Sequence, residues 1–155
     1  MAEIEGWRQE YIDQVIRPVI SQSALDLVAK HRDAGDLCAI VTATNAFVTR
    51  PIAGLFGVQH LLGAEGEVKD GRYTGEPQGT ITFQAGKLVR LREWLQEQGL
   101  TPDDFDEIWA YSDSRNDLPM LELATHPVAT NPDAILRQTA ETRGWPGIEL
   151  FPLVG

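Results

Sequence analysis

Apolar residues follow two patterns along the chain, and the two patterns alternate. Uninterrupted apolar runs, as in Leu37–Val41 and Ile108–Tyr111, are typical of strands buried on both faces of a parallel sheet. Segments with an apolar residue at every third or fourth position predict helices, and the clearest of them is Gly86–Gly99. Strands that alternate with helices predict an α/β protein whose Rossmann-like parallel sheet is flanked by helices.

The chain is expected to begin with two helices. Glu3–Arg17 keeps its apolar residues close to one helical face, and Pro18 is expected to end that helix. A second helix should start at a cap on Ser21 or Ser23 and stop at Gly35. Both helices precede the first predicted strand.

The first strand is expected to stop at a loop rich in hydroxyl groups, Thr42–Asn45. The next helix contains Pro51, which is easiest to place in a first turn if Thr49 is the cap. An earlier start with a kink is the alternative. Further along, a hairpin is predicted with Asp70 and Gly71 at its tip.

The last part of the chain repeats the alternation. Pro127–Thr130 predicts a strand, Asn131–Asp133 the capped start of a helix, and Ala134–Arg143 the helix itself. Trp145–Gly155 contains two prolines and is expected to be a loosely packed strand or tail.

Composition limits the classes of function. The 155 residues suffice for one domain with its own core, and the formal net charge is −10. This charge opposes binding to nucleic acid or to an anionic membrane, so local positive groups must attract any anionic ligand. The only cysteine, Cys38, suits a reducing compartment, and the sequence shows no export signal or membrane span. A cytoplasmic protein is predicted.

The segment Ser112–Asp117 gathers polar oxygen atoms between a predicted strand and a predicted helix. Asp113 and Asp117 are close enough in sequence to share one small volume, where two like charges are costly unless a cation lies between them. Mg²⁺ is the natural candidate, because it takes oxygen ligands and needs only one or two carboxylates besides water and phosphate. The alternative is that Asn116 or Asp117 simply caps the next helix, with Pro119 in its first turn.

Lys87 lies in the first turn of the predicted helix Gly86–Gly99. A cation there opposes the helix dipole by about 0.3–1 kcal/mol, so an anion is expected to share the site. An ordinary solvated lysine is the alternative. The sequence contains neither G-x-G-x-x-G nor G-x-x-x-x-G-K-[ST], the signatures of dinucleotide and P-loop nucleotide binding.

Three motifs, in this order, resemble those of the haloacid-dehalogenase-like superfamily and its phosphoserine-phosphatase-like branch. They are the apolar strand that ends in Val41-Thr-Ala-Thr44, the pair Gly86-Lys87 before a helix, and the acidic segment Tyr111–Leu121. The resemblance covers nearly the whole chain and implies the fold of that family, with Mg²⁺ as cofactor.

Carried over by position, the resemblance implies a role for each motif residue. Thr42 and Ala43 would bind the substrate phosphate through the hydroxyl and a neighbouring amide, and Lys87 would neutralise its charge. Asp113 would be the main Mg²⁺ ligand. Asn116 and Asp117 would support the metal and lysine side of the site, with Asp117 also placed among the metal ligands and catalytic residues.

The sequence departs from the family at one important place. The family's first motif, an apolar strand ending in D-x-D-x-[TV], carries the nucleophile and the general acid or base, and it is absent. Asp103, Asp104 and Asp106 follow Pro102 in a polar setting and do not replace it. The chain is therefore interpreted as truncated at its N-terminus: residues 1–20 would be a remnant of a helical cap, and residues 21–155 a core without its first, central strand.

Two functions from different classes follow from this comparison. The first is a Mg²⁺-dependent phosphomonoester hydrolase of small phosphorylated metabolites, of the phosphoserine or histidinol phosphate type, whose turnover the chain alone should lack. The second is a non-catalytic domain that binds phosphate or metal. A phosphoacceptor receiver domain is set aside, because its acidic residues precede its Thr and Lys in the chain. Strand edges left unpaired by the missing strand are expected to cause self-association.

Overall fold

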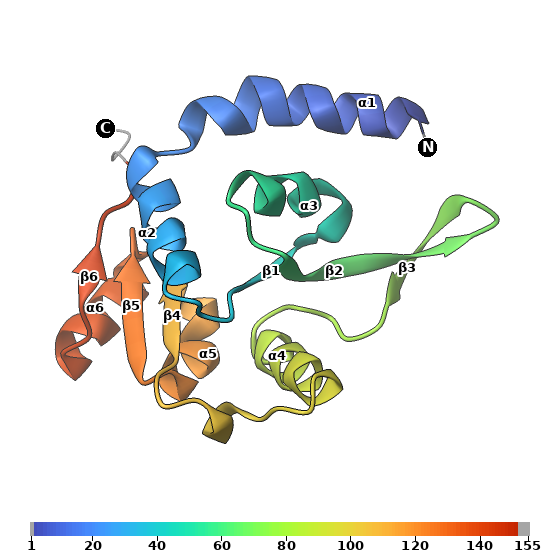
Figure 1. Ribbon diagram of the computed structural model, residues 1–155. Helices are drawn as coiled ribbons and strands as arrows, with labels where there is room; N and C mark the ends of the chain where they lie inside the picture. Colours follow the sequence, from blue (N-terminus) through green and yellow to red (C-terminus); the bar gives the residue numbers. More distant parts are fainter. Residues whose placement is uncertain (1, 152–155) are drawn as a thin grey trace. The chain divides into compact units, whose positions relative to one another are not determined.

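The computed structural model describes residues 2–151, and its contacts divide the chain into two compact units. We call them the N-terminal unit, Met1–Thr82, and the C-terminal unit, Phe83–Gly155. Each contains helices and a sheet with parallel strands, so the predicted α/β class is confirmed (Figure 1). No helix within residues 2–151 is both long enough and apolar enough to cross a membrane.

The N-terminal unit begins with the two predicted helices. Helix α1 (Ala2–Tyr11) continues through a π-helical turn, Ile12–Ile16, into a short 3₁₀ helix that contains Pro18. Helix α2 (Gln22–Asp33) starts at Ser21, whose hydroxyl accepts a hydrogen bond from the Ala24 amide at 3.1 Å. The predicted cap on Ser21 is therefore confirmed, and Ser23 lies inside the helix.

The sheet of the N-terminal unit has three strands in the order β1-β2-β3. Strands β1 (Ala39–Asn45) and β2 (His60–Lys69) are parallel, and β3 (Arg72–Gln78) returns antiparallel to β2. The hairpin turns at Asp70 and Gly71, both with positive φ, as its tight turn requires. Its tip was predicted correctly, whereas β2 is one long strand that forms both the parallel and the antiparallel pair.

Helix α3 (Ala46–Leu55) starts earlier than the Thr49 cap would allow, so that prediction is wrong and the earlier start is right. The Asn45 side chain accepts a hydrogen bond from the Phe47 amide at 2.8 Å and is the cap. Pro51 therefore lies inside the helix and has no N–H to offer the carbonyl of Phe47. Arg8 of α1 donates to that carbonyl at 3.2 Å instead, which compensates for the proline.

Strand β1 is less buried than its apolar sequence predicts. Ala39, Ile40 and Val41 are half-buried, and Leu37 before them is 41% exposed. Within residues 2–151, β1 pairs with β2 along one edge only. The expectation of a strand buried on both faces is wrong, because the apolar residues of β1 stay partly exposed. The predicted self-association through such an edge stays a prediction.

The C-terminal unit follows the predicted alternation closely, with its strands parallel and in the order β4-β5-β6. Its elements are α4 (Ala85–Glu97), β4 (Trp109–Ser112), α5 (Leu118–Leu123), β5 (His126–Thr130), α6 (Ala134–Arg143) and β6 (Gly147–Ile148). In Figure 1, α5 and α6 lie beside this sheet. The core of the unit forms there, from Leu121, Ala129, Leu136 and Ala140.

Candidate functional site

The acidic segment forms a tight turn where β4 ends. The strand stops at Ser112, Asp113 is exposed, and a 3₁₀ helix over Arg115–Asp117 leads into α5. Ser114 caps this turn, since its hydroxyl accepts a hydrogen bond from the Asn116 amide at 3.1 Å. The predicted turn between strand and helix is confirmed, and the capping side chain is neither Asn116 nor Asp117.

Lys87 and Asp117 form a buried ion pair inside the C-terminal unit. Lys87 Nζ lies 2.8 Å from Asp117 Oδ1, and the two side chains are only 13% and 8% exposed. The other oxygen of Asp117, Oδ2, accepts a hydrogen bond from the Ser112 hydroxyl at 2.5 Å. Lys87 is thus not an ordinary solvated lysine. Its burial would be costly without a partner of opposite charge, and Asp117 is that partner. Both oxygens of Asp117 have protein partners, so its predicted role as a metal ligand stays a prediction.

Gln84 connects the start of α4 to the acidic turn. It precedes the helix with a φ of +48°, and its side chain donates a hydrogen bond to Asn116 Oδ1 at 3.4 Å. A non-glycine residue in this region of φ is uncommon and costs energy, so the surrounding contacts must hold it there. Sequence reasoning missed Gln84, because nothing in its local pattern predicts a positive φ.

Asp133 holds the acidic turn from the other side. Its amide donates to the carbonyl of Asp113 at 2.8 Å, and its carboxylate accepts from the amides of Leu136 at 2.7 Å and Arg115 at 2.8 Å. These two amides, Leu136 first, keep the pKa of Asp133 below its ordinary value. The sequence predicts Asp133 only as part of a helix cap. The bond to Arg115 spans 18 residues, so no local pattern could have revealed it.

A hollow of about 230 Å³ opens beside Asp113. It is lined by Tyr111, Ser112, Asp113, Thr130, Asn131 and Phe151. Asn131 holds Leu150 and Phe151 near it, since its side chain accepts from the Leu150 amide at 2.7 Å and donates to the Phe151 carbonyl at 2.9 Å. The hydroxyl of Thr130 is buried and has no hydrogen-bond partner within the described chain.

The side chains beside this hollow suit a hard cation. Asp113 offers an exposed carboxylate and Thr130 a hydroxyl, the oxygen donors that Mg²⁺ prefers. Residues 2–151 contain no group of three or more His, Cys, Asp or Glu side chains that could hold a metal by themselves. Mg²⁺ does not need such a group, because it keeps several waters and binds through one or two carboxylates.

The predicted phosphate loop lies in the N-terminal unit and is part of β1. Pairing with β2 is regular up to Val41 and resumes at Asn45, so three residues, Thr42–Thr44, bulge opposite the single residue Gly63. A Cβ on Gly63 would lie 3.1 Å from the Cα of Ala46, which explains the glycine. The prediction that Thr42–Asn45 is a loop after the strand is therefore wrong, because the segment belongs to β1 and remains paired with β2 at Asn45.

The hydroxyl of Thr42 has a local partner in this bulge. It accepts a hydrogen bond from the Thr44 amide at 3.1 Å. Thr42 is half-buried, whereas Ala43 is exposed. The structure therefore brings Lys87, Asn116 and Asp117 together in one unit and places Thr42 and Ala43 in the other. The predicted contact of Thr42 and Ala43 with a phosphate group stays a prediction.

Asp104 and Asp106 have the D-x-D spacing but not the setting of a nucleophile. Asp104 ends a short 3₁₀ helix, Pro102–Asp104, that precedes β4. Its carboxylate accepts hydrogen bonds from the Thr101 amide at 2.7 Å and the Thr101 hydroxyl at 3.3 Å. Because the carboxylate belongs to this capping box, the prediction that these acidic residues do not replace the missing motif agrees with the geometry.

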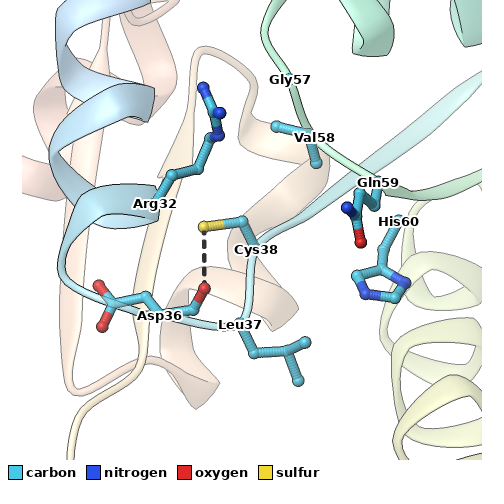
Figure 2. Close-up of a pocket in the computed structure, with 8 residues that line it drawn as sticks. All are labelled: Arg32, Asp36, Leu37, Cys38, Gly57, Val58, Gln59 and His60. Atoms are coloured by element: carbon cyan, nitrogen blue, oxygen red, sulfur yellow. Dashed lines mark hydrogen bonds between the residues drawn. The ribbon is translucent and has the colours of Figure 1, made fainter.

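A second hollow, of about 280 Å³, lies in the N-terminal unit (Figure 2). It is found where β1 and β2 begin, and its lining includes Arg32, Cys38 and His60. Burial first, and then the carboxylate of Asp36, raise the pKa of the Cys38 thiol. In Figure 2 the sulfur points to the Asp36 carbonyl, 3.5 Å away. Ligands of open α/β sheets bind at the carboxyl ends of strands, so this hollow is not the candidate site.

Comparison with known proteins links the chain to one family. The sequence pattern of the family described as haloacid dehalogenase-like hydrolase matches residues 2–122. A histidinol-phosphatase of Neisseria meningitidis is 41% identical over 145 residues, which cover 93% of this chain and 65% of the relative. Phosphoserine phosphatase SerB1 of Mycobacterium tuberculosis is 37% identical over 145 residues, covering 94% of this chain and 46% of the relative. The chain thus spans less than two thirds of either curated relative.

Solved structures support the same fold. A protein of unknown function from Bordetella pertussis is 52% identical and superposes with a TM-score of 0.95, over 97% of this chain and 67% of that one. A substrate-bound phosphoserine phosphatase has a TM-score of 0.62 at 22% identity, over 83% of this chain and 58% of that one. At that identity the likeness concerns the fold alone.

Proposed function

Since the chain belongs to the haloacid dehalogenase-like hydrolase family, we propose that it carries the lysine and metal side of a Mg²⁺-dependent phosphomonoester hydrolase. The observation that supports this best is the buried pair of Lys87 and Asp117, 2.8 Å apart beside the acidic turn. Phosphoryl transfer depends mostly on positioning and on cationic groups that stabilise the phosphate oxygens. Lys87 is such a group, and Asp117 and Ser112 hold it in place.

Small phosphorylated metabolites are the proposed substrates. The relatives are named as phosphatases of histidinol phosphate and of phosphoserine, both small phosphomonoesters. With a net charge of −10, the chain needs a local cation to attract such an anion, and Lys87 lies beside the acidic turn, bound to Asp117.

Asp113 is the residue proposed to hold Mg²⁺. Its backbone is fixed by Asp133 while its carboxylate stays exposed beside the hollow of about 230 Å³. When bound, Mg²⁺ would neutralise negative charge on the phosphate oxygens. The protein side of the mechanism is then to orient the anion with Lys87, to hold Lys87 in place through its ion pair with Asp117, and to present Asp113 at a fixed position.

A non-catalytic domain that binds phosphate or metal is the second candidate. It is favoured by one observation: Asp104, which has the D-x-D spacing with Asp106, uses its carboxylate in a helix cap. Loss of a covalent nucleophile can cost on the order of 10⁶ in turnover. We therefore expect the chain by itself to bind these ligands without appreciable hydrolysis under either candidate function.

A fusion separates the two candidates. The chain is joined to the part of the N. meningitidis histidinol-phosphatase that it does not span, and release of phosphate from histidinol phosphate and phosphoserine is measured with and without Mg²⁺. The hydrolase predicts Mg²⁺-dependent release that Lys87→Met lowers roughly 100- to 1,000-fold. Lys30→Met, a change at an exposed lysine of α2, is the control and should have no effect. A folded fusion that binds Mg²⁺ but releases no phosphate would favour the non-catalytic domain.

A further inference from the structure

Thr130, the last residue of β5, carries a buried hydroxyl that no contact explains. The residue is 9% exposed, and its Oγ1 has no hydrogen-bond partner within residues 2–151. A buried hydroxyl without a partner is costly to the folded state, and native proteins avoid such groups unless something else binds them. This hydroxyl therefore indicates a polar partner that is not part of the protein.

Thr130 and Asp113 line the same hollow of about 230 Å³. Ser112, the last residue of β4, pairs with Ala129 of β5 in a parallel ladder. Asp113 and Thr130 each follow one member of this last pair in the sequence, so both lie at the end of the ladder between β4 and β5.

Two neighbouring polar side chains of the hollow are already engaged. The Ser112 hydroxyl accepts from the Ser114 amide at 3.1 Å and donates to Asp117. The Asn131 side chain binds the backbone of Leu150 and Phe151. Neither side chain forms a hydrogen bond with the Thr130 hydroxyl, so a partner for this hydroxyl has to come from outside the protein, near Asp113.

We propose that the Thr130 hydroxyl is a positioning group for the hydrated cation that Asp113 binds, and that it forms a hydrogen bond with a water of the cation's hydration shell. This rests on the proposed function, because it presupposes Mg²⁺ at Asp113. Mg²⁺ gives up its waters reluctantly, and groups that bind those waters orient the ion and raise its affinity. Thr130 is a positioning residue and not a catalytic one, because it acts through water.

The test compares four forms of the chain: the wild type, Thr130→Val, Thr130→Ser and Asp113→Asn. Valine keeps the shape of threonine without the hydroxyl, and serine keeps the hydroxyl. Mn²⁺ serves as a paramagnetic substitute for Mg²⁺, and its binding is followed by electron paramagnetic resonance, which detects weak affinities. The stability of each form towards urea is measured without metal.

We expect Thr130→Val to weaken Mn²⁺ binding roughly three- to ten-fold, the effect of one lost hydrogen bond, and Thr130→Ser to stay near the wild type. Without metal, Thr130→Val should be at least as stable as the wild type, because it removes an unpaired buried hydroxyl. If the hydroxyl were merely structural, Thr130→Val would lower the stability of the chain and leave its affinity for Mn²⁺ unchanged.

The outcomes also separate this proposal from the proposed function. If Asp113→Asn abolishes binding while Thr130→Val binds as the wild type does, the positioning role is wrong and the metal site stands. If the wild type binds no Mn²⁺, or Asp113→Asn binds it equally well, both the metal site and the role of Thr130 are overturned.

Discussion

The carboxyl ends of β1 and β4 both carry motif residues, but they are built in different ways. At the end of β1, the Thr42 hydroxyl accepts a hydrogen bond from an amide two residues away, and the bulge Thr42–Thr44 is flanked by backbone pairing with β2. At the end of β4, the acidic turn is held by Lys87 from α4 and by Asp133 from the start of α6. The side-chain contact of the first end is local, whereas the second end is held by charged side chains that are distant in the chain.

This difference shows which of the two strand ends is preorganised by charged side chains. Charged groups must be held rigidly to stabilise a phosphate, since an electrostatic site works best when it needs no rearrangement. The acidic turn meets this condition through the contacts of Lys87 and Asp133. The Thr42 bulge does not, so we expect substitutions there to have smaller effects on stability.

Breaking the ion pair should produce the largest effect. Lys87→Met leaves the Asp117 carboxylate buried without its cation, and we expect the free energy of unfolding to fall by about 3–5 kcal/mol. Adding Asp117→Asn should restore a large part of this loss, because the buried charge is removed. Urea denaturation of both variants and of the control Lys30→Met measures the effect. Equal stability of Lys87→Met and the wild type would show that the pair does not hold the turn.

Removing the Asp133 side chain should have the next largest effect. Asp133→Ala deletes the cap of α6 and the bond to the Arg115 amide, so the free energy of unfolding should fall by about 1–2 kcal/mol. Asp133→Asn keeps a good cap and should cost less. Urea denaturation is again the measurement. If Asp133→Ala cost no more than a surface substitution, the turn would not depend on this residue.

Thr42→Ala should have a smaller effect on stability. It removes one hydrogen bond to an exposed backbone segment, so the expected loss is about 0.5–1.5 kcal/mol, while Thr42→Ser should be close to the wild type. A loss from Thr42→Ala larger than that from Asp133→Ala would reverse the comparison between the two strand ends. The same urea experiments decide this.

The smallest effect concerns Cys38, just before the start of β1. We expect a shift in the pH dependence of its reactivity. Its pKa is raised above the ordinary value of 9.0, so at a given pH less thiolate is present than for a free cysteine. At a given pH below the pKa, labelling with iodoacetamide should therefore be slower in the folded chain than in the unfolded chain, and its rate should level off at a higher pH. The pH profile of the folded chain, compared with that in urea, measures the shift. A folded profile displaced to lower pH would contradict it.

Local patterns predicted the elements of the C-terminal unit well. Apolar runs and cap residues placed β4, β5 and α6 correctly, because these signals depend on neighbours in sequence. The order of the three motifs also identified the family. The start of α3 was harder to predict, because Asn45 and Thr49 are both acceptable caps and the contact of Arg8 that compensates for Pro51 comes from a distant helix.

The candidate site could be predicted only in part. Lys87 and Asp117 were predicted as site residues, but their direct contact depends on the packing of α4 against the turn. Gln84 and Asp133 act through long-range hydrogen bonds, which no sequence pattern records. The role proposed for Thr130 rests on a buried hydroxyl without a hydrogen-bond partner in the described chain, which only the structure reveals. Burial of β1 was overestimated, because an apolar run does not reveal how completely other elements cover the strand.

Calorimetric titration of Mg²⁺ tests the central claim, that the turn after β4 presents Asp113 to a metal ion. The titration compares the wild type with Asp113→Asn and with Asp103→Asn, a change of an exposed residue in the preceding 3₁₀ helix. The account predicts that Asp113→Asn weakens binding at least about ten-fold, the effect of roughly 1.4 kcal/mol, and that Asp103→Asn leaves it unchanged. Equal affinities of the two variants would contradict the account.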